Sequence, residues 1–283
     1  QPHPQEKTML VKDVMHGRAV AIDPNETLPS AAVMMEELGV KRLPVMQGGR
    51  VVGLLTDGEI KRKLPHVSEG LSAWDFAVKA GRVRVREAMR MPVLTLTPET
   101  PLASAVQTML ERRVGGMPVV DEDGELRGML TLTDVLRRAS ESPNPAWGTA
   151  GEHMSREVVS VSADDAANEG AARLTVSRLR VLPVLSGGKL LGLLHEKDVT
   201  AALEREMAVQ GRDVASSLLL RDQPVTALMR APSGRLTPQT PLAEVMYKMV
   251  ELDVHGLPVV GENDELLGVL TVSDVLKAMV GTV

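Results

Sequence analysis

The feature that most constrains the fold is a segment of 18 or 19 residues that occurs four times along the chain. It reads LPVMQGGRVVGLLTDGEI around Pro44 and MPVVDEDGELRGMLTLTDV around Pro118. It returns as LPVLSGGKLLGLLHEKDV around Pro183 and as LPVVGENDELLGVLTVSDV around Pro258. Such a regular recurrence indicates one supersecondary unit copied four times, and the spacing of the prolines groups the copies into two tandem pairs.

Each copy predicts the element order β-α-β-β-α, which makes the fold class α/β (α+β). A short extended lead-in, such as residues 18–22 or 92–96, precedes a helix whose start is marked by threonine and proline. Thr27, Thr100 and Thr240 are the expected N-caps, because proline follows each of them within the first turn. Two strands joined by a turn follow, as at 117–120 and 126–131, and a second helix is expected to begin near Thr133.

The four units are expected at residues 9–66, 83–140, 149–205 and 222–283. A unit of roughly 60 residues would be marginally stable alone, so we expect each pair to share a core, giving modules 9–140 and 149–283. A linker with two prolines at 140–149 separates the modules. Segments 61–83 and 200–222 are expected to be surface helices, and residues 1–8 a disordered arm or a remnant of cloning.

Composition excludes several classes of protein. With 43% hydrophobic residues, 24% charged residues and a net charge of −5, the chain has no electrostatic footprint for nucleic acid or a membrane surface. It contains no cysteine and no apolar run long enough to span a bilayer, and a cytoplasmic location is expected. Aromatic residues make up 1% of the chain, so the core must consist of Val, Leu, Met and Ala.

The second strand of each unit runs into a frame of the form Gly-h-h-Thr-x-x-Asp, where h is apolar. Gly128, Thr131 and Asp134 carry it in full in the second unit. Four β-α-β-β-α units with this ending resemble the cystathionine-β-synthase (CBS) domain family, and each tandem pair resembles a Bateman module. The resemblance implies clefts between paired domains that bind an adenosine-containing ligand, with the threonine and aspartate contacting the ribose.

Elementary chemistry agrees with that role. Thr131 ends a strand and Asp134 lies in the first turn of the next helix, so both face one junction. A carboxylate there can accept charge-assisted hydrogen bonds from two vicinal hydroxyls, and the helix N-terminus keeps it ionised. The alternative is that the aspartate only complements its helix. The expected ribose residues are Thr56, Glu59, Thr131, Asp134, Asp198, Thr271 and Asp274, with Glu59 replacing the aspartate of the first unit and His195 the threonine of the third.

Two further sets of residues are candidates for the remaining parts of such a ligand. The resemblance implies phosphate contacts from basic residues before the proline strand, namely Lys41, Arg42, Arg180 and His255; the alternative is solubilising surface charge. Apolar lead-in residues would form the adenine floor, namely Val20, Ile22, Val93 and Leu94; the alternative is that they fill the core. The fourth unit departs from this pattern, because Ser233, Gly234 and Arg235 replace its apolar lead-in.

We therefore expect a regulatory sensor that responds to AMP, ADP, ATP or S-adenosylmethionine by changing conformation or assembly. No cofactor, metal site or catalytic residue is expected, since neither a nucleophile triad nor a P-loop nor a metal-binding spacing of histidines is present. The modules are expected to self-associate into a disc or a homodimer, and a regulated protein partner is expected in trans. The alternative is a ligand-free interaction scaffold, similar to a gamma-type regulatory subunit of a kinase or transporter.

Overall fold

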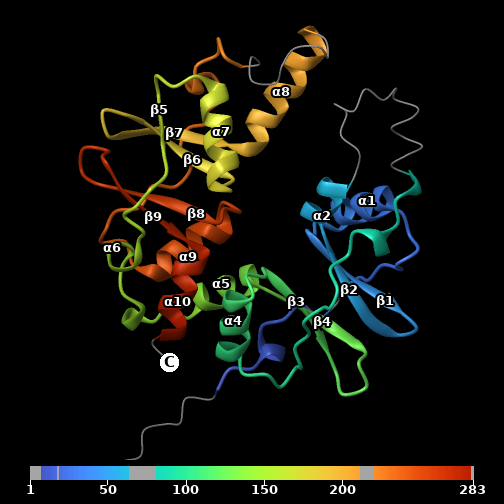
Figure 1. Cartoon of the computed structure of the whole chain (residues 1–283). Coiled ribbons are helices and arrows are strands. Elements are labelled where there is room, and N and C mark those ends of the chain that lie inside the picture. Colours follow the sequence, from blue (N-terminus) through green and yellow to red (C-terminus); the bar gives the residue numbers. More distant parts are fainter. Residues whose placement is uncertain (1–7, 18, 64–80, 211–219, 282–283) are drawn as a thin grey trace, which may run out of the picture. The chain divides into compact units, whose positions relative to one another are not determined.

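The computed structural model describes residues 8–17, 19–63, 81–210 and 220–281. It divides into two compact units, with the division after Arg138, and each unit contains two of the sequence repeats (Figure 1). Residues 1–7 of the expected N-terminal arm, residues 64–80 of the expected surface helix at 61–83 and residues 211–219 of the one at 200–222 lie outside the described residues. Within the described part, the second of these helices is present up to Gln210.

The first unit holds repeats one and two, and in its described residues each repeat has two α-helices and one antiparallel hairpin. The first repeat consists of η1 (Val11–Asp13), α1 (Leu28–Leu38), β1 (Arg42–Gln47), β2 (Arg50–Thr56) and α2 (Asp57–Lys63). The second repeat consists of η3 (Val85–Glu87), α4 (Leu102–Glu111), β3 (Gly116–Val120), β4 (Leu126–Thr131) and α5 (Leu132–Glu141).

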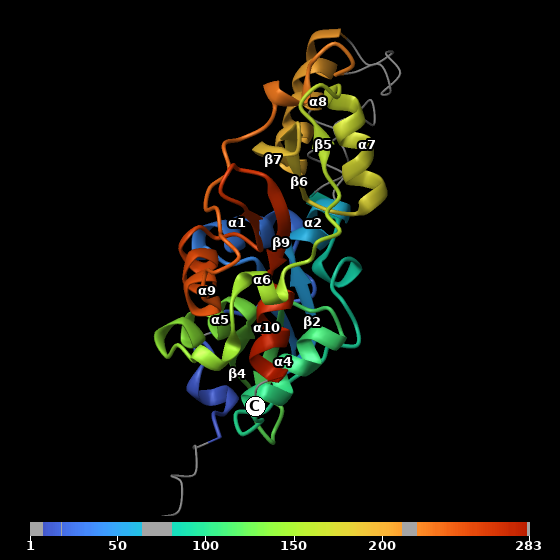
Figure 2. The same cartoon turned by 90° about the vertical axis from the view of Figure 1, so that its left-hand side faces the viewer.

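The second unit repeats this plan. The third repeat consists of η4 (Pro145–Trp147), α6 (Ala150–His153), β5 (Val161–Ser162), α7 (Ala167–Ser177), β6 (Val181–Ser186), β7 (Lys189–His195) and α8 (Glu196–Gln210). The fourth repeat consists of η5 (Val225–Ala227), α9 (Leu242–Glu251), β8 (Gly256–Val260), β9 (Leu266–Thr271) and α10 (Val272–Gly281). The short helix α6 lies beside β9 and α10, so the start of the third repeat packs on the end of the fourth (Figure 2).

Among the residues that the structure describes, the expected lead-in strands are almost absent, which corrects the sequence-based expectation. Ile22, Leu96 and Leu236 each form one isolated parallel bridge, and only β5 reaches two residues. The reason is the proline at the third position of each neighbouring strand. Ile22 donates to the carbonyl of Pro44 at 2.9 Å and accepts from Met46 at 3.0 Å, but the next bond of a parallel ladder needs an N–H that Pro44 lacks.

The helix starts were predicted correctly in one of three cases. Thr27 caps α1, and its side chain accepts from the N–H of Ser30. The expectation for Thr100 and Thr240 was wrong, because α4 and α9 begin two residues later, after Pro101 and Pro241. Thr100 Oγ1 instead accepts from the N–H of Thr97 at 3.2 Å, so it closes the turn that precedes the helix.

The two repeats of a unit interlock through the residues that precede their lead-ins. The first N–H of α1 donates to the carbonyl of Val83 at 3.0 Å, and that of α4 donates to Met9 at 2.8 Å. The second unit has the same exchange, from Ala167 to Gln223 at 2.8 Å and from Leu242 to Gly148 at 3.1 Å. Each repeat therefore satisfies an orphan donor at the helix start of its partner, which explains why the repeats occur in pairs.

The core is aliphatic, as the scarcity of aromatic residues predicted. In the first unit one buried cluster joins α1, β1, β2, α2 and η3; it comprises Ile22, Leu28, Ala31, Met35, Leu43, Val45, Leu55, Ile60, Val85 and Ala88. A matching cluster in the second unit comprises Val161, Ala167, Leu174, Leu182, Val184, Leu194, Val199, Ala202, Leu220 and Val225. Both clusters take residues from two repeats, so neither repeat has this core to itself.

Candidate ligand sites at four strand–helix junctions

Each repeat ends a hairpin strand against a helix that carries a carboxylate in its first turn. We call these carboxylates the motif carboxylates and number their sites in chain order: Glu59, Asp134, Asp198 and Asp274. They lie at the starts of α2, α5, α8 and α10, at the junctions that the sequence frame indicated. The residue three positions earlier ends the strand and is threonine in sites one, two and four, but His195 in site three.

In sites two and four the structure brings the expected Thr–Asp pair together. The N–H and Oγ1 of Thr131 donate to Asp134 Oδ2 at 2.9 and 2.6 Å. Thr271 donates in the same way to Asp274 Oδ2, at 2.9 and 2.5 Å. A side chain that accepts from the backbone three residues earlier satisfies a donor at the helix start. One carboxylate oxygen is thus used by the fold, and any ligand contact depends on the other.

The second oxygen of Asp274 is open. Within the described part of the chain, Asp274 Oδ1 has no hydrogen-bond or ion-pair partner. The aspartate is half-buried, so the oxygen is held in place by its neighbour while remaining accessible. Site four therefore offers a fixed anionic acceptor beside a hydroxyl, which is the arrangement that a vicinal diol can bridge.

In site two the corresponding oxygen is already engaged. His16 Nδ1 lies 2.8 Å from Asp134 Oδ1, and Arg137 lies at 3.9 Å from the same oxygen. The Asp134 side chain is only 3% exposed. A ligand hydroxyl would have to displace the imidazole to reach this carboxylate.

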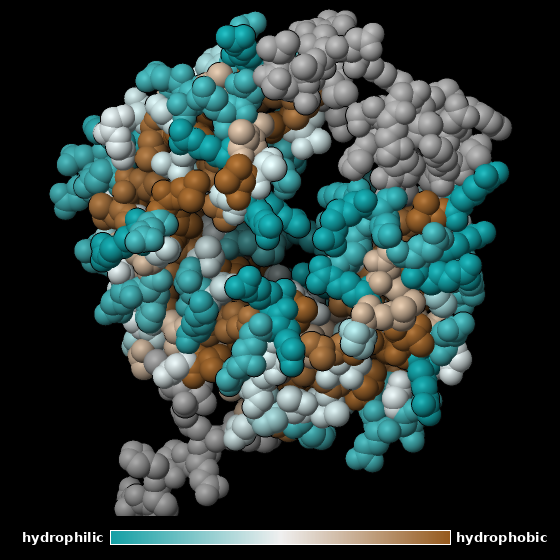
Figure 3. Space-filling model, in the orientation of Figure 1, coloured by the Kyte–Doolittle hydropathy of each residue, from teal (hydrophilic) through white to brown (hydrophobic). Residues whose placement is uncertain are grey.

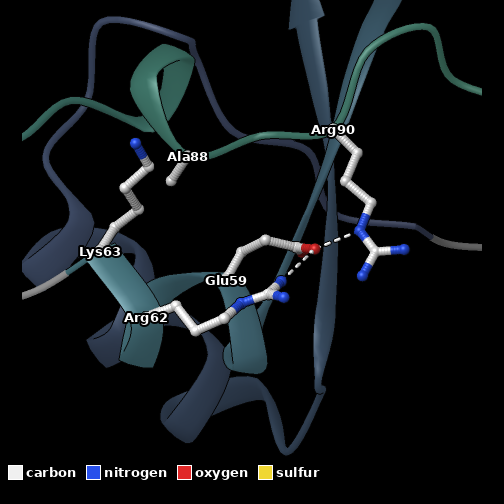
Figure 4. A pocket seen from close by; sticks show the side chains of 5 residues that line it. All are labelled: Glu59, Arg62, Lys63, Ala88 and Arg90. Carbon is white, nitrogen blue, oxygen red and sulfur yellow. Dashed lines mark hydrogen bonds and ion pairs between the residues drawn. The ribbon is translucent and has the colours of Figure 1, made fainter.

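Site one is engaged by two arginines. Thr56 donates to Glu59 Oε2 through its N–H at 2.9 Å and through its hydroxyl. The other oxygen, Oε1, accepts from Arg62 at 3.0 Å and from Arg90, as Figure 4 shows. A cavity of about 400 Å³ lies here, lined by Glu59, Arg62, Lys63, Ala88 and Arg90. Hydrophilic side chains predominate over α1 and α2 on the face in Figure 3.

Site three lacks the hydroxyl and compensates with a cation. Both oxygens of Asp198 accept from Arg230, Oδ2 from Nε at 2.5 Å and Oδ1 from Nη2. This bidentate pair lowers the pKa of the Asp198 carboxyl below its usual range. His195 stands where the other sites have threonine, so this site has no hydroxyl to donate to the carboxylate. Burial is the main cause that lowers the pKa of His195, and the side chain is therefore neutral near pH 7.

The contacts of His16, Arg90 and Arg230 with the motif carboxylates were not found by sequence reasoning, because each of these side chains comes from the other repeat of its unit. His16 and Met129 exchange backbone hydrogen bonds at 2.9 and 3.1 Å. Arg90 pairs with Leu54 and Arg230 with Leu193 in the same register, and Ser155 pairs with Val269. A sequence signal exists: each of the four follows a methionine, in the segments VMH, AMR, HMS and LMR.

This exchange also explains the glycine of the Gly-h-h-Thr frame. A Cβ on Gly128 would lie 2.2 Å from the carbonyl oxygen of His16, and one on Gly268 would lie 2.7 Å from that of Ser155. Real Cβ atoms do not approach a backbone oxygen so closely. The glycine is therefore required for the segment of one repeat that holds His16 or Ser155 to reach the motif carboxylate of the other repeat.

The four residues expected to contact phosphate differ in their exposure to solvent. Arg42 is half-buried against Gly115 and Gly116, whose missing side chains leave room for its guanidinium. Burial lowers its pKa, and Glu59 and Asp134 are among the charges that act on it. Arg42 thus lies between sites one and two. The others, Lys41, Arg180 and His255, are exposed.

The expected adenine residues are divided between surface and core. Ile22 is 4% exposed and belongs to the core of the first unit, so its placement matches the structural alternative. Val20 and Leu94 are exposed, and Val93 is half-buried, which leaves these three accessible to a ligand. Among the described residues, no cluster of three or more His, Cys, Asp or Glu could hold a metal ion.

None of the helices in the described ranges is both long and apolar enough to cross a membrane.

Comparison with known proteins identifies the repeats. CBS domains match residues 11–66, 85–141, 150–205 and 225–281. Protein MJ1225 of Methanocaldococcus jannaschii is 26% identical over 278 residues, which are 95% of this chain and 98% of that protein. Its crystal structure, described as that of a proposed archaeal homologue of g-AMPK, matches with a TM-score of 0.71 at 25% identity, over 96% of this chain and all of that one.

Two other proteins match over nearly the whole chain, one by its structure and one by its sequence. The crystal structure of an uncharacterized conserved protein from Pyrococcus horikoshii has a TM-score of 0.69 at 23% identity, over 96% of this chain and all of that one. Protein MJ1404 of M. jannaschii is 23% identical over 270 residues, or 94% of this chain but 61% of that longer protein. The chain belongs to the CBS-domain family, of which it carries four copies.

Proposed function

We propose that this chain is a non-catalytic regulatory protein that binds an adenosine-containing ligand, such as AMP, ADP, ATP or S-adenosylmethionine, at its motif carboxylates. The observation that carries the proposal is site four. There Thr271 fixes one oxygen of Asp274, while the other oxygen is open among the described residues. The family membership and the full-length likeness to a proposed homologue of g-AMPK support it.

The remaining ligand groups would be held by the residues named above. Val20, Val93 and Leu94 are accessible apolar candidates for adenine, and Arg42 is the candidate whose placement best suits phosphate oxygens, because its planar fork faces the interior of the first unit. Lys41, Arg180 and His255 are surface candidates. Binding regulates by population shift, since a ligand moves an equilibrium by the difference in its affinity for two states. The regulated protein is a partner in trans or a second copy of the chain.

A second candidate function rests on sites one to three. Their motif carboxylates are already paired with Arg90, His16 and Arg230, which is the condition expected of an interaction scaffold that needs no ligand. In this alternative the clefts are structural, and the chain acts as a gamma-type subunit through protein contacts alone.

Thermal unfolding against AMP, ADP, ATP and S-adenosylmethionine separates the two functions. A ligand at one hundred times its Kd stabilises the folded state by about 2.7 kcal/mol per site, which raises Tm by several degrees. We expect a shift for at least one ligand, loss of that shift in Asp274→Ala, and its retention in the control Glu262→Ala, an exposed carboxylate of the same repeat. No shift for any ligand would favour the scaffold.

A further inference from the structure

The four sites share one backbone frame but differ in the side chain that the partner repeat delivers to the motif carboxylate. We call the four methionines that precede the lead-ins the lead-in methionines: Met15, Met89, Met154 and Met229. The residue after each of them is, in the same order, His16, Arg90, Ser155 and Arg230. In each case it forms an isolated β-bridge with a residue of the other repeat, two positions before the end of the hairpin strand. The three basic side chains pair with the motif carboxylates of sites two, one and three. In the described structure, only the serine leaves its carboxylate without a basic side chain from the partner repeat.

A cation in this position competes with a ribose. Arg230 donates two hydrogen bonds to the two oxygens of Asp198, and a vicinal diol would need the same acceptors. Arginine suits a carboxylate because its fork is planar and permanently charged, so the pair must open before a diol can bind. At site four no such step is needed.

We infer that the residue after each lead-in methionine is a built-in competitor for the ligand, so that Arg230 closes site three while Ser155 leaves site four open. The inference rests on the proposed function and adds to it the order in which the sites fill. A ligand occupies site four first. Occupation of site three requires release of Arg230, which makes binding there weaker and dependent on ionic strength, because salt weakens the exposed side of this ion pair.

The competitor also explains a pairing of substitutions in the sequence. Site three has His195 in place of the threonine that donates to the carboxylate at the other sites, and Arg230 donates to its carboxylate twice. The arginine therefore neutralises a carboxylate that the strand end no longer satisfies. Its 55% exposed side chain reaches the site from the surface, so it can leave without disturbing the core.

Isothermal titration with adenosine tests the inference, because adenosine carries the diol but no charge that Arg230 could attract. The variants are Arg230→Ser, which copies site four into site three, and Ser155→Arg, which does the reverse. Arg221→Ser, at an exposed arginine just before the fourth repeat, is the matched control. Arg230→Gln keeps the length of the side chain and serves if the serine variant does not fold, as judged by its thermal unfolding.

We expect Arg230→Ser to gain a binding equivalent, with affinity at site three rising on the order of tenfold, as for loss of one charged hydrogen-bonding competitor. Ser155→Arg should lose the equivalent that the wild type has at site four, and Arg221→Ser should match the wild type. Unchanged binding in both Arg230→Ser and Ser155→Arg would overturn the inference while leaving the proposed function intact. No binding of adenosine or AMP by the wild type or any variant would overturn both. Binding only by Arg230→Ser would overturn the inferred order of filling, because site four would then be empty in the wild type.

Discussion

Sites three and four lie in the same unit, at the same kind of junction, and hold their aspartates in opposite ways. Asp274 is fixed by its own strand, through the N–H and hydroxyl of Thr271. Asp198 has His195 in place of that threonine and is fixed instead by Arg230, from the other repeat. A half-buried carboxylate must be satisfied by some donor, and which donor it has decides whether an oxygen remains for a ligand.

The comparison teaches that the Gly-h-h-Thr-x-x-Asp frame is not sufficient to define a site. Site two carries the frame in full, yet His16 engages its second oxygen. Site four carries the same frame and is open because Ser155 takes the place of that histidine. The availability of each carboxylate is set by a residue about 115–120 positions away in sites two and four, on the partner repeat, and so by the pairing of repeats.

The largest expected effect tests whether the backbone frame is common to both sites. Gly268→Ala and Gly192→Ala should each destabilise the second unit by about 1–3 kcal/mol, because the new Cβ would lie 2.7 Å from the carbonyl oxygen of Ser155 or of Arg230. Calorimetric unfolding measures the cost. Gly281→Ala, which has nothing within 4 Å of its Cβ, is the control. If one substitution lowered the stability and the other did not, sites three and four would not share the same backbone arrangement.

A smaller effect tests the side chains of site four. Thr271→Val keeps the shape of the residue but removes the hydroxyl that donates to Asp274 Oδ2 at 2.5 Å. Loss of one hydrogen bond to a charged group costs about 1.5–3 kcal/mol, part of which the backbone N–H of Thr271 recovers. We expect the affinity for AMP in a titration to fall roughly tenfold. An unchanged affinity would show that the hydroxyl does not orient the carboxylate for binding.

The smallest effect concerns pH and site three. Burial lowers the pKa of His195, so the unfolded chain takes up this proton at a higher pH than the folded protein does. Protonation therefore favours unfolding: the stabilisation is complete above the ordinary pKa of 6.5 and declines as the pH falls below it. A change from pH 7.5 to 5 should lower the free energy of unfolding of the second unit less in His195→Thr than in the wild type. The expected difference is below about 1 kcal/mol, since solvent screens a half-exposed group.

This pH window isolates the histidine from its neighbour. Arg230 lowers the pKa of Asp198 below its ordinary 3.8, so the stability that Asp198 contributes is lost only at more acid pH. Unfolding curves for wild type and His195→Thr across the window provide the measurement. Equal pH dependence for the two proteins would contradict the assignment.

Much of the fold could be predicted from the sequence, because each repeat encodes its own hairpin and helices. The pairing of Thr131 with Asp134 follows from their three-residue separation at a strand–helix junction, as does that of Thr271 with Asp274. The contacts of His16, Arg90 and Arg230 with the motif carboxylates could not be predicted, since they join different repeats and depend on register rather than on local pattern. The prediction that Thr100 and Thr240 are N-caps failed because proline extends the lead-in before the helix begins.

The most direct test of the account is a crystal structure of the protein with AMP at a concentration near the Kd of its tightest site. The account predicts AMP with its ribose hydroxyls on Asp274, beside Thr271, while Arg230 remains paired with Asp198. AMP bound at Asp198 with site four empty would contradict the account, because the ligand would then prefer the carboxylate that already has a cation over the one that is open.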